Sequence, residues 1–415
     1  MDVTITPTKL AGTVIPPPSK SQAHRALIAA ALADGVCTIS NVAFSQDLEA
    51  TVSCLENLGA QFTREGAALT VQGMAANAMS PLRRMAPPRL DCGESGSTLR
   101  FLIPVALAVR GGGIFDRRGR LMERPLKPYF DLFEEKGIPS EQKDGMLTVT
   151  GLLTPGEYRL PGDVSSQFIT GLLYALPLLD GDSEIVLTSP LESRGYVDMT
   201  LDVQKKFGIR AERTNDRRFL IPGNQVFQAR DLTIEADWSQ AGFWYAAKAL
   251  GNRVEISGLD HRSVQGDRVL AVHARELSRP GDVDIDVSGC PDLVPPLAAM
   301  AAVRSGTARF TNAARLRIKE SDRFAAIIQT LSALGAEVAE GVRGPDSFAV
   351  TGKPALAGGV KVDSFRDHRI AMMAAIAAAR CVKPVAITGA ECVAKSYPNF
   401  WEDYEKLGGK IHKSE

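Results

Sequence analysis

The stretch Thr51–Gly73 reads TVSCLENLGAQFTREGAALTVQG and contains the pattern that organises the whole chain. Its first half is typical of an amphipathic helix that ends at Gly59, because glycine readily supplies the left-handed residue that closes a helix. Its second half holds two short runs joined by a turn, and partial alternation such as Ala68-Leu69-Thr70-Val71 is typical of strands with one wet face. The stretch therefore predicts a helix followed by two short strands.

The same phrase returns at intervals of roughly 70 residues, which indicates an internal repeat. Full copies lie at Tyr129–Gly151, Leu201–Gly223 and Ile328–Gly352, and a truncated copy lies at Phe400–Ile411. One interval is about twice the others, and a degraded copy at Arg268–Arg279 falls inside it. The chain is therefore expected to contain six units.

A second phrase alternates with the first and consists of a polar start followed by a helix of small apolar residues. Helices that are apolar on nearly every side belong in a domain core, so each unit should contain one buried helix. The six candidates are Ser19–Ala33, Ser95–Val109, Ser165–Leu179, Asp237–Leu250, Pro291–Val303 and Ser364–Ala379.

Six units are too many for one compact domain, and three plus three is the natural division. The run Pro16-Pro17-Pro18 is a stiff candidate for one crossover between domains. The second crossover is expected near Pro222–Asp237. The predicted domains are residues 20–234 and residues 1–19 combined with 235–415.

Composition and charge exclude several classes of protein. The 415 residues contain 48 Lys+Arg and 48 Asp+Glu, so bulk charge offers no attraction to nucleic acid or to anionic lipid. No apolar stretch reaches the ~20 residues of a membrane span, and the first residues show no signal-peptide pattern. The six cysteines form no C-x-x-C pair and the five histidines no H-E-x-x-H motif, so we expect no metal and a cytoplasmic location.

The starts of the buried helices carry residues that suit an anion site. Helix N-termini attract anions, and cations there oppose the helix dipole, so Lys20 and Arg369 indicate a function rather than a structural role. For the serines at these starts, ordinary N-capping is the favoured interpretation. The stretch Arg315–Arg323 (RLRIKESDR), if helical, puts Lys319 and Arg323 on one face. Taken alone, however, the stretch is better interpreted as a solvated, salt-bridged surface helix.

Seven motifs occur in an order that matches one family. They are PSKSQAHR (18–25), SGSTLR (95–100), ERP (123–125), VSSQF (164–168), KESDR (319–323), DHR (367–369) and AKSYP (394–398). Along essentially its whole length the chain resembles the 5-enolpyruvylshikimate-3-phosphate synthases (3-phosphoshikimate 1-carboxyvinyltransferases). The resemblance implies an α/β fold of two similar domains, each built from three βαβαββ units around buried helices, the inside-out α/β barrel of the enolpyruvyl transferases.

The resemblance also implies a reaction. The enolpyruvyl group of phosphoenolpyruvate would move to the 5-hydroxyl of shikimate-3-phosphate and release phosphate, a transferase step of the shikimate pathway towards chorismate and the aromatic amino acids. Acid–base groups on each side of the reacting carbon suffice for this chemistry, so no metal and no organic cofactor are expected. The enzyme would be a monomer whose partners are its two small substrates, with no nucleic acid and no membrane.

The family's functional residues carry over onto matching positions. The first domain would hold shikimate-3-phosphate, and the second would supply the catalytic carboxylates and the cations for phosphoenolpyruvate. The implied catalytic residues are Asp292 as base for the 5-hydroxyl, Glu320 as the shuttle for the methylene proton, and Lys20. The implied shikimate-3-phosphate ligands are Lys20, Ser21, Arg25, Ser165, Ser166, Gln167, Ser193, Asp292 and Lys319, with Tyr196 beside the ring. The implied phosphoenolpyruvate ligands are Lys20, Gly96, Arg124, Gln167, Arg323, Arg369 and Lys395.

Two positions depart from the family's pattern. Glu94 and Arg315 stand where many members carry Asn, so Glu94 is expected either to pair with an arginine or to face away, and a ligand role for Arg315 is in doubt. Gly96 is retained, and by family analogy it leaves room for glyphosate, so we expect inhibition by that compound.

Two alternatives remain open at this stage. The UDP-N-acetylglucosamine enolpyruvyl transferases share the fold and the donor, but they carry a reactive cysteine in a glycine-rich loop, and Gly111–Arg124 contains no cysteine. A non-catalytic anion-binding protein on the same scaffold is the second alternative, and the retention of both Asp292 and Glu320 weighs against it.

Overall fold

The computed structural model describes residues 1–75 and 86–414, and these divide into two compact units. Unit 1 contains Met1–Ser19 and Ala236–Glu415, and unit 2 contains Lys20–Glu235. Each unit has a hydrophobic core of its own. Along the described residues no helix is both long and apolar enough to cross a membrane.

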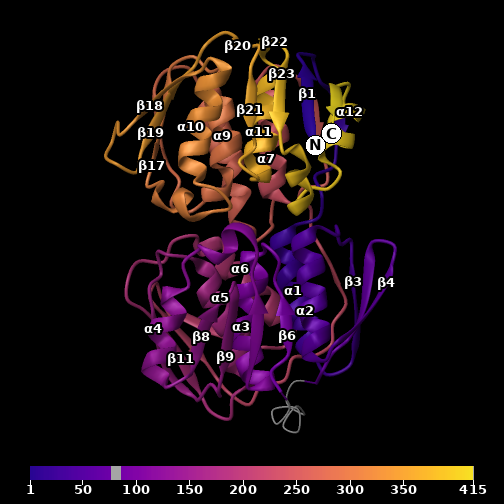
Figure 1. The fold of residues 1–415 in the computed structure, drawn as a ribbon, viewed down its shortest axis with the longest axis vertical. Coiled ribbons are helices and arrows are strands. Elements are labelled where there is room, and N and C mark those ends of the chain that lie inside the picture. The colour runs from indigo at the N-terminus through magenta and orange to yellow at the C-terminus, as the bar shows by residue number, and fades with distance from the viewer. Residues whose placement is uncertain (76–85, 415) are drawn as a thin grey trace. The chain divides into compact units, whose positions relative to one another are not determined.

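Unit 2 combines buried helices, amphipathic helices and sheets of short strands (Figure 1). Its helices are α1 (Lys20–Leu32), α2 (Gln46–Leu58), α3 (Gly96–Arg110), α4 (Lys127–Lys136), α5 (Ser166–Ala175) and α6 (Arg194–Lys206), with 3-10 turns η3 (Gly119–Met122) and η4 (Leu176–Leu178). Its strands are β3 (Val36–Ser40), β4 (Gln61–Glu65), β5 (Ala68–Gln72), β6 (Arg89–Asp91), β7 (Gly112–Asp116), β8 (Ser140–Lys143), β9 (Met146–Thr150), β10 (Gly156–Leu160), β11 (Ser183–Leu187), β12 (Glu212–Asn215), β13 (Arg218–Ile221) and β14 (Leu232–Thr233).

Unit 1 repeats the arrangement. Its helices are α7 (Trp238–Ala249), α8 (Leu270–Ser278), α9 (Val294–Ala301), α10 (Arg323–Leu334), α11 (His368–Ala378) and α12 (Phe400–Lys406), with 3-10 turns η5 (Gly266–Val269), η6 (Pro291–Leu293), η7 (Ala314–Ile318) and η8 (Ala390–Lys395). Its strands are β1 (Asp2–Thr6), β2 (Ala11–Val14), β15 (Arg253–Ile256), β16 (Val283–Asp286), β17 (Thr307–Thr311), β18 (Glu337–Glu340), β19 (Phe348–Thr351), β20 (Leu356–Gly358), β21 (Lys361–Asp363), β22 (Cys381–Lys383), β23 (Val385–Thr388) and β24 (Lys410–Ser414).

Within residues 1–75 and 86–414, five four-stranded sheets share one topology, which confirms the repeat. Their orders are β14-β3-β5-β4, β6-β7-β9-β8, β10-β11-β13-β12, β16-β17-β19-β18 and β21-β23-β1-β24. In each sheet the first two strands are parallel and the other neighbours are antiparallel. The fold class predicted from the motifs, two similar α/β domains of the enolpyruvyl transferase type, is therefore confirmed.

The sixth unit departs from the expected βαβαββ pattern. Its strands β2 and β15 form a parallel pair, and the amphipathic helix α8 leads directly to β16 without a hairpin among the described residues. The degraded copy at Arg268–Arg279 thus kept its helix and lost its two strands. The truncated copy near the C-terminus, in contrast, belongs to a complete four-stranded sheet. Strand β1, from the start of the chain, pairs with both β23 and β24 and supplies the strand that the copy lacks.

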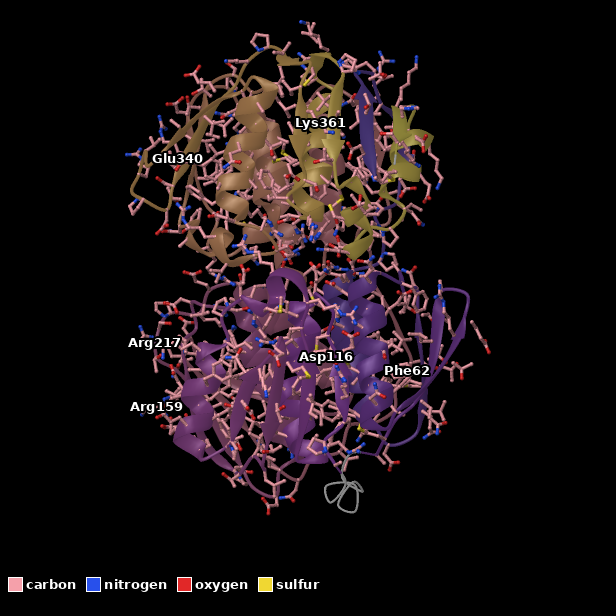
Figure 2. All side chains as sticks on the ribbon, in the orientation of Figure 1. Phe62, Asp116, Arg159, Arg217, Glu340 and Lys361 are labelled. Carbon is pink, nitrogen blue, oxygen red and sulfur yellow. The ribbon has the colours of Figure 1, made fainter. Side chains whose placement is uncertain are left out.

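All six predicted core helices are present, and their side chains are almost entirely buried. The strands around them alternate between buried and less buried residues, as in β5 and β9. Exposed charged residues such as Arg159 of β10 and Glu340 of β18 lie on the outside of their units (Figure 2). Each unit thus contains three buried helices, and predicted ligands such as Lys20, Gly96 and Arg369 lie at the starts of these helices.

Candidate functional site

At the start of α1, Lys20 is held by a partner that the sequence did not reveal. Its Nζ lies 2.7 Å from Oδ2 of Asp47, a residue in the first turn of α2, and both side chains are largely buried. The backbone carbonyl of Asp47 accepts hydrogen bonds from the hydroxyls of Thr51 and Thr98. Asp47 therefore ties Lys20 to α2 and α3 while satisfying its charge.

One turn later in α1, Arg25 is buried and links α1 to α6. Its Nη1 donates to the carbonyl of Ser21, its Nε to Oγ1 of Thr200, and its Nη2 to the carbonyl of Tyr196. Burial lowers the pKa of Arg25 to about 10. The predicted ligands Ser21 and Arg25 are thus brought together with Tyr196, and Arg25 fixes the start of α6 against α1.

The starts of α3 and α5 are joined through Gln167. Its Nε2 donates to Oγ of Ser97 at 2.9 Å, and its Oε1 accepts from Nη1 of Arg100 at 2.7 Å. Gly96 begins α3 directly beside Arg124, because a Cβ built on Gly96 would lie 2.5 Å from Nη1 of Arg124. Gly96, Arg124 and Gln167, which were all predicted to bind phosphoenolpyruvate, therefore form one cluster in unit 2.

The serines at these helix starts have two kinds of role. The Oγ atoms of Ser95 and Ser165 accept from the backbone N–H of Thr98 and Gln167, which is N-capping as expected. Ser166 opens α5 and is mostly buried. Ser193 precedes α6 with φ at +51°, a left-handed conformation that costs free energy for a residue with a side chain.

Glu94 is directed toward the η3 turn. A Cβ added at Gly119 would lie 2.7 Å from its Oε1, and Gly119 has a φ of +52°. The turn is also fixed by the N–H of Arg118, which donates to the carbonyl of Gly93. Glu94 thus packs on the segment that leads to Arg124.

In unit 1 the predicted residues converge on Arg323, whose side chain is completely buried. Its Nη1 lies 2.8 Å from Oδ1 of Asp292, its Nη2 lies 2.5 Å from Oε2 of Glu320, and its Nε lies 2.9 Å from Oδ2 of Asp367. These three carboxylates raise the pKa of Arg323 although burial alone would lower it. Arg323 therefore connects both carboxylates to which proton transfer was assigned.

Asp292 and Lys319 form the second ion pair of this cluster, with Nζ 3.2 Å from Oδ1. Burial would raise the pKa of Asp292, but the charges of Lys319, Arg369 and Arg323 outweigh it and hold that pKa well below 3.8. Burial lowers the pKa of Lys319 to about 8 although Asp292 opposes the shift. Lys319 consequently loses its proton within an accessible pH range.

Two further predicted cations border this cluster. Arg369, at the start of α11, donates from Nη1 to the carbonyl of Asp292 and places Nη2 3.5 Å from its Oδ2. Lys395, in η8, donates to the carbonyl of Arg366 in the turn before α11. Unit 1 thus gathers three basic predicted residues, Lys319, Arg323 and Arg369, around Asp292, and Arg323 links them to Glu320.

The conditional expectation of a helix over Arg315–Arg323 is wrong. The 3-10 turn η7 ends at Ile318, Lys319 is extended, and α10 begins only at Arg323 because Asp322 caps it by accepting from the N–H of Ala325. The extended segment turns Lys319 and Glu320 toward Asp292 and Arg323. Arg315 is mostly buried and points its Nη1 toward the carbonyl of Ser288.

The sequence did not reveal the residues that position the predicted ligands, namely the partners of Lys20, Gln167 and Arg323. Asp47 looked like an ordinary acidic residue in a first helical turn, Arg100 like part of a buried helix, and Asp367 like an N-cap. His24 is packed inside unit 2, with Nδ1 2.8 Å from Oγ1 of Thr51 and its pKa lowered by burial and by the nearby cations Lys20 and Arg25. Among residues 1–75 and 86–414 no group of three or more His, Cys, Asp or Glu residues could hold a metal ion.

Known proteins match the chain over its whole length. The family model described as EPSP synthase (3-phosphoshikimate 1-carboxyvinyltransferase) matches residues 5–404. Relatives named 3-phosphoshikimate 1-carboxyvinyltransferase include one from Clostridium kluyveri, 47% identical over 99% of this chain and 98% of its own, and one from Clostridioides difficile, 43% identical over 98% and 97%.

Solved structures of the same fold are more distant in sequence. An EPSP synthase from Acinetobacter baumannii has a TM-score of 0.80 at 22% identity and covers 99% of this chain and 100% of its own. The enolpyruvyl transferase NikO from Streptomyces tendae has a TM-score of 0.73 at 17% identity, over 99% and 98%.

Proposed function

Because the chain belongs to the EPSP synthase family, we propose that it transfers the enolpyruvyl group of phosphoenolpyruvate to the 5-hydroxyl of shikimate-3-phosphate and releases inorganic phosphate. The observation that carries this proposal is the Arg323 cluster, in which one buried arginine contacts both Asp292 and Glu320. Such an arrangement supplies a proton donor, a proton acceptor and anion ligands in one place.

The substrates are anions, and the cations of both units are assigned to them. In this proposal shikimate-3-phosphate is held by Lys20, Ser21, Arg25, Ser165, Ser166, Gln167, Ser193, Asp292 and Lys319. Phosphoenolpyruvate is held by Lys20, Gly96, Arg124, Gln167, Arg323, Arg369 and Lys395. Helix starts add backbone N–H donors to these side chains, which favours phosphate and carboxylate groups further.

Proton transfer is assigned to the two carboxylates. Glu320 protonates the methylene carbon of phosphoenolpyruvate, and C2 becomes cationic. Asp292 takes the proton of the 5-hydroxyl as its oxygen attacks C2. The tetrahedral intermediate then expels inorganic phosphate while the new methyl group returns a proton to Glu320, which restores the vinyl group in the product.

The low pKa of Asp292 makes it a weak base until substrates arrive. Its basicity is suppressed by Lys319, Arg369 and Arg323, the cations that this proposal assigns to substrate anions. When a phosphate or carboxylate shares their charge, the pKa of Asp292 rises toward the range in which a carboxylate accepts a proton efficiently. Substrate binding thereby activates the base only when there is a hydroxyl to deprotonate.

We place the reaction in the cytoplasm. All six cysteines are free thiols, and each of them is buried. Unpaired cysteines in this number suit a reducing compartment, since oxidising compartments favour disulfides.

The test is phosphate release by the purified protein with phosphoenolpyruvate plus either shikimate-3-phosphate or UDP-N-acetylglucosamine. Release with the shikimate ester alone is the expected result. Release with the sugar nucleotide alone would overturn the acceptor. Silence with both acceptors, in a protein that melts cooperatively, would favour a binding protein and would make the roles of Asp292 and Glu320 wrong.

A further inference from the structure

Asp367 is the most deeply buried carboxylate of the unit 1 cluster, and the proposed reaction gives it no role. Its side chain is 0% exposed. Its Oδ2 lies 2.9 Å from Nε of Arg323 and accepts from Oγ of Ser321 at 3.0 Å, and its Oδ1 lies 3.3 Å from Nη2 of Arg323. The carboxylate therefore grips one edge of the guanidinium with both oxygens, the arrangement that fixes an arginine most firmly.

N-capping alone does not account for these contacts. As the N-cap of α11, Asp367 needs one oxygen, Oδ1, to accept from the N–H of Arg369 at 2.9 Å. Asp322 shows what a cap without this grip looks like, because it caps α10 through Oδ1 while Nη1 of Arg317 lies 3.7 Å from its Oδ2. Capping thus leaves unexplained the contacts of Asp367 with Arg323 and the complete burial of its side chain.

We propose that Asp367 is a positioning residue, which holds the guanidinium of Arg323 in the one orientation that reaches Asp292 and Glu320 together. The inference rests on the function proposed above. Nε and one edge of Nη2 are taken by Asp367, so Nη1 is left to meet Asp292 and the other side of Nη2 to meet Glu320. Without this anchor the guanidinium can rotate about its last torsions and keep only one of the two catalytic carboxylates.

Charge balance gives the inference a second consequence. Lys319 faces Asp292, Glu320, Arg315 and Arg323, and its ionisation responds to all four. If Asp367 loses its charge, the positive charge of Arg323 is less compensated, and the ammonium form of Lys319 becomes less favourable. A variant that only weakened the helix cap would leave the ionisation of Lys319 unchanged.

The experiment compares Asp367→Asn with Asp322→Asn as the matched cap variant. Asn keeps the capping oxygen in both, so both proteins should melt close to the wild type. For Asp367→Asn, kcat should fall by about 30-fold or more, on the order of the loss of a charge-assisted hydrogen-bonded pair, with KM for shikimate-3-phosphate changed less. The alkaline limb of its pH profile should move to lower pH, whereas Asp322→Asn should keep both the rate and the limb.

If Asp367→Asn does not fold, the variant Ser321→Ala and a double-mutant cycle of Asp367 and Arg323 provide the test. Ser321→Ala removes one hydrogen bond to Oδ2, and it should lower kcat several-fold without changing the melting temperature. In an Arg323→Lys background, adding Asp367→Asn should cost little more, because the group being positioned is gone. Wild-type kcat and an unmoved alkaline limb in Asp367→Asn, or wild-type kcat in Ser321→Ala, would overturn the inference. An inactive wild type would instead overturn the proposed function.

Discussion

At the scale of single residues, Lys319 is the group whose ionisation should be visible in the kinetics. Its pKa is lowered to about 8 by burial, so the ammonium that meets Asp292 is lost as pH rises through that value. The profile of kcat/KM, which reports the free enzyme, should therefore fall above pH about 8. Because anionic substrates favour the ammonium form, the limb in kcat should lie at higher pH.

Replacing Lys319 with Arg tests the assignment of this limb. Arginine does not titrate in this range, so the decline above pH about 8 should disappear from the profile of Lys319→Arg even if its maximal rate is lower. A limb that stays in place would show that another group titrates there.

Asp47 should matter to turnover through Lys20. Asp47→Asn removes the carboxylate that holds Nζ at 2.7 Å and should lower kcat by about tenfold, the size expected when one charged hydrogen bond is lost. Glu49→Gln is the matched control, because Glu49 lies in the same first turn of α2 but is exposed. Equal losses in both variants would mean that the helix dipole, and not Lys20, is responsible.

At the scale of elements, the start of α3 limits what can bind beside Arg124. In Gly96→Ala the new Cβ would lie 2.5 Å from Nη1 and 2.8 Å from Cζ of Arg124, so the flexible guanidinium must move while the fold stays intact. KM for phosphoenolpyruvate should rise about tenfold or more, and KM for shikimate-3-phosphate should change little. An unchanged KM for phosphoenolpyruvate would remove Arg124 from the donor site.

Inhibition of the wild-type chain by glyphosate stays a prediction, and an inhibition constant in the millimolar range would count against it.

Helices and hairpins were predictable because local patterns determine them. The sequence alone shows the glycine after α2, the apolar residues of α1 and α11, and the capping serine of α3. The extended conformation of Lys319 could not be predicted, because the residues around it are good helix formers. Its backbone conformation depends on the capping of α10 by Asp322 and on the contact of Lys319 with Asp292, which is distant in sequence. Partners such as Asp47 stayed hidden for the same reason: an ion pair across 27 residues leaves no local pattern.

At the scale of the whole molecule, two of the sheets are completed by a strand that lies far away in the sequence. β14 joins the sheet of β3, and β1 joins that of β23 and β24, so the first and last strands of the chain share one sheet. The repeat count predicted six units, but it could not show that one hairpin is missing or which strand completes the last sheet. Strand pairing depends on contacts distant in sequence, which a single chain does not display.

This closure makes the first strand essential to the stability of unit 1. Ile5 of β1 is fully buried and pairs with Val385 and Ile411. Ile5→Ala should lower the free energy of unfolding by about 2–5 kcal/mol, whereas Thr6→Ala, at an exposed position of the same strand, should have little effect. Equal effects in chemical denaturation would mean that β1 contributes through its backbone alone.

The proposed reaction is enolpyruvyl transfer with proton exchange at the methylene carbon of phosphoenolpyruvate. The most direct measurement is a proton NMR time course of the purified protein with phosphoenolpyruvate and shikimate-3-phosphate in D2O. We predict that a new vinyl signal grows in step with inorganic phosphate and carries deuterium, because a methyl group forms and is deprotonated on the way. Phosphate release without a new vinyl signal, or a vinyl product that never takes up deuterium, would contradict the account.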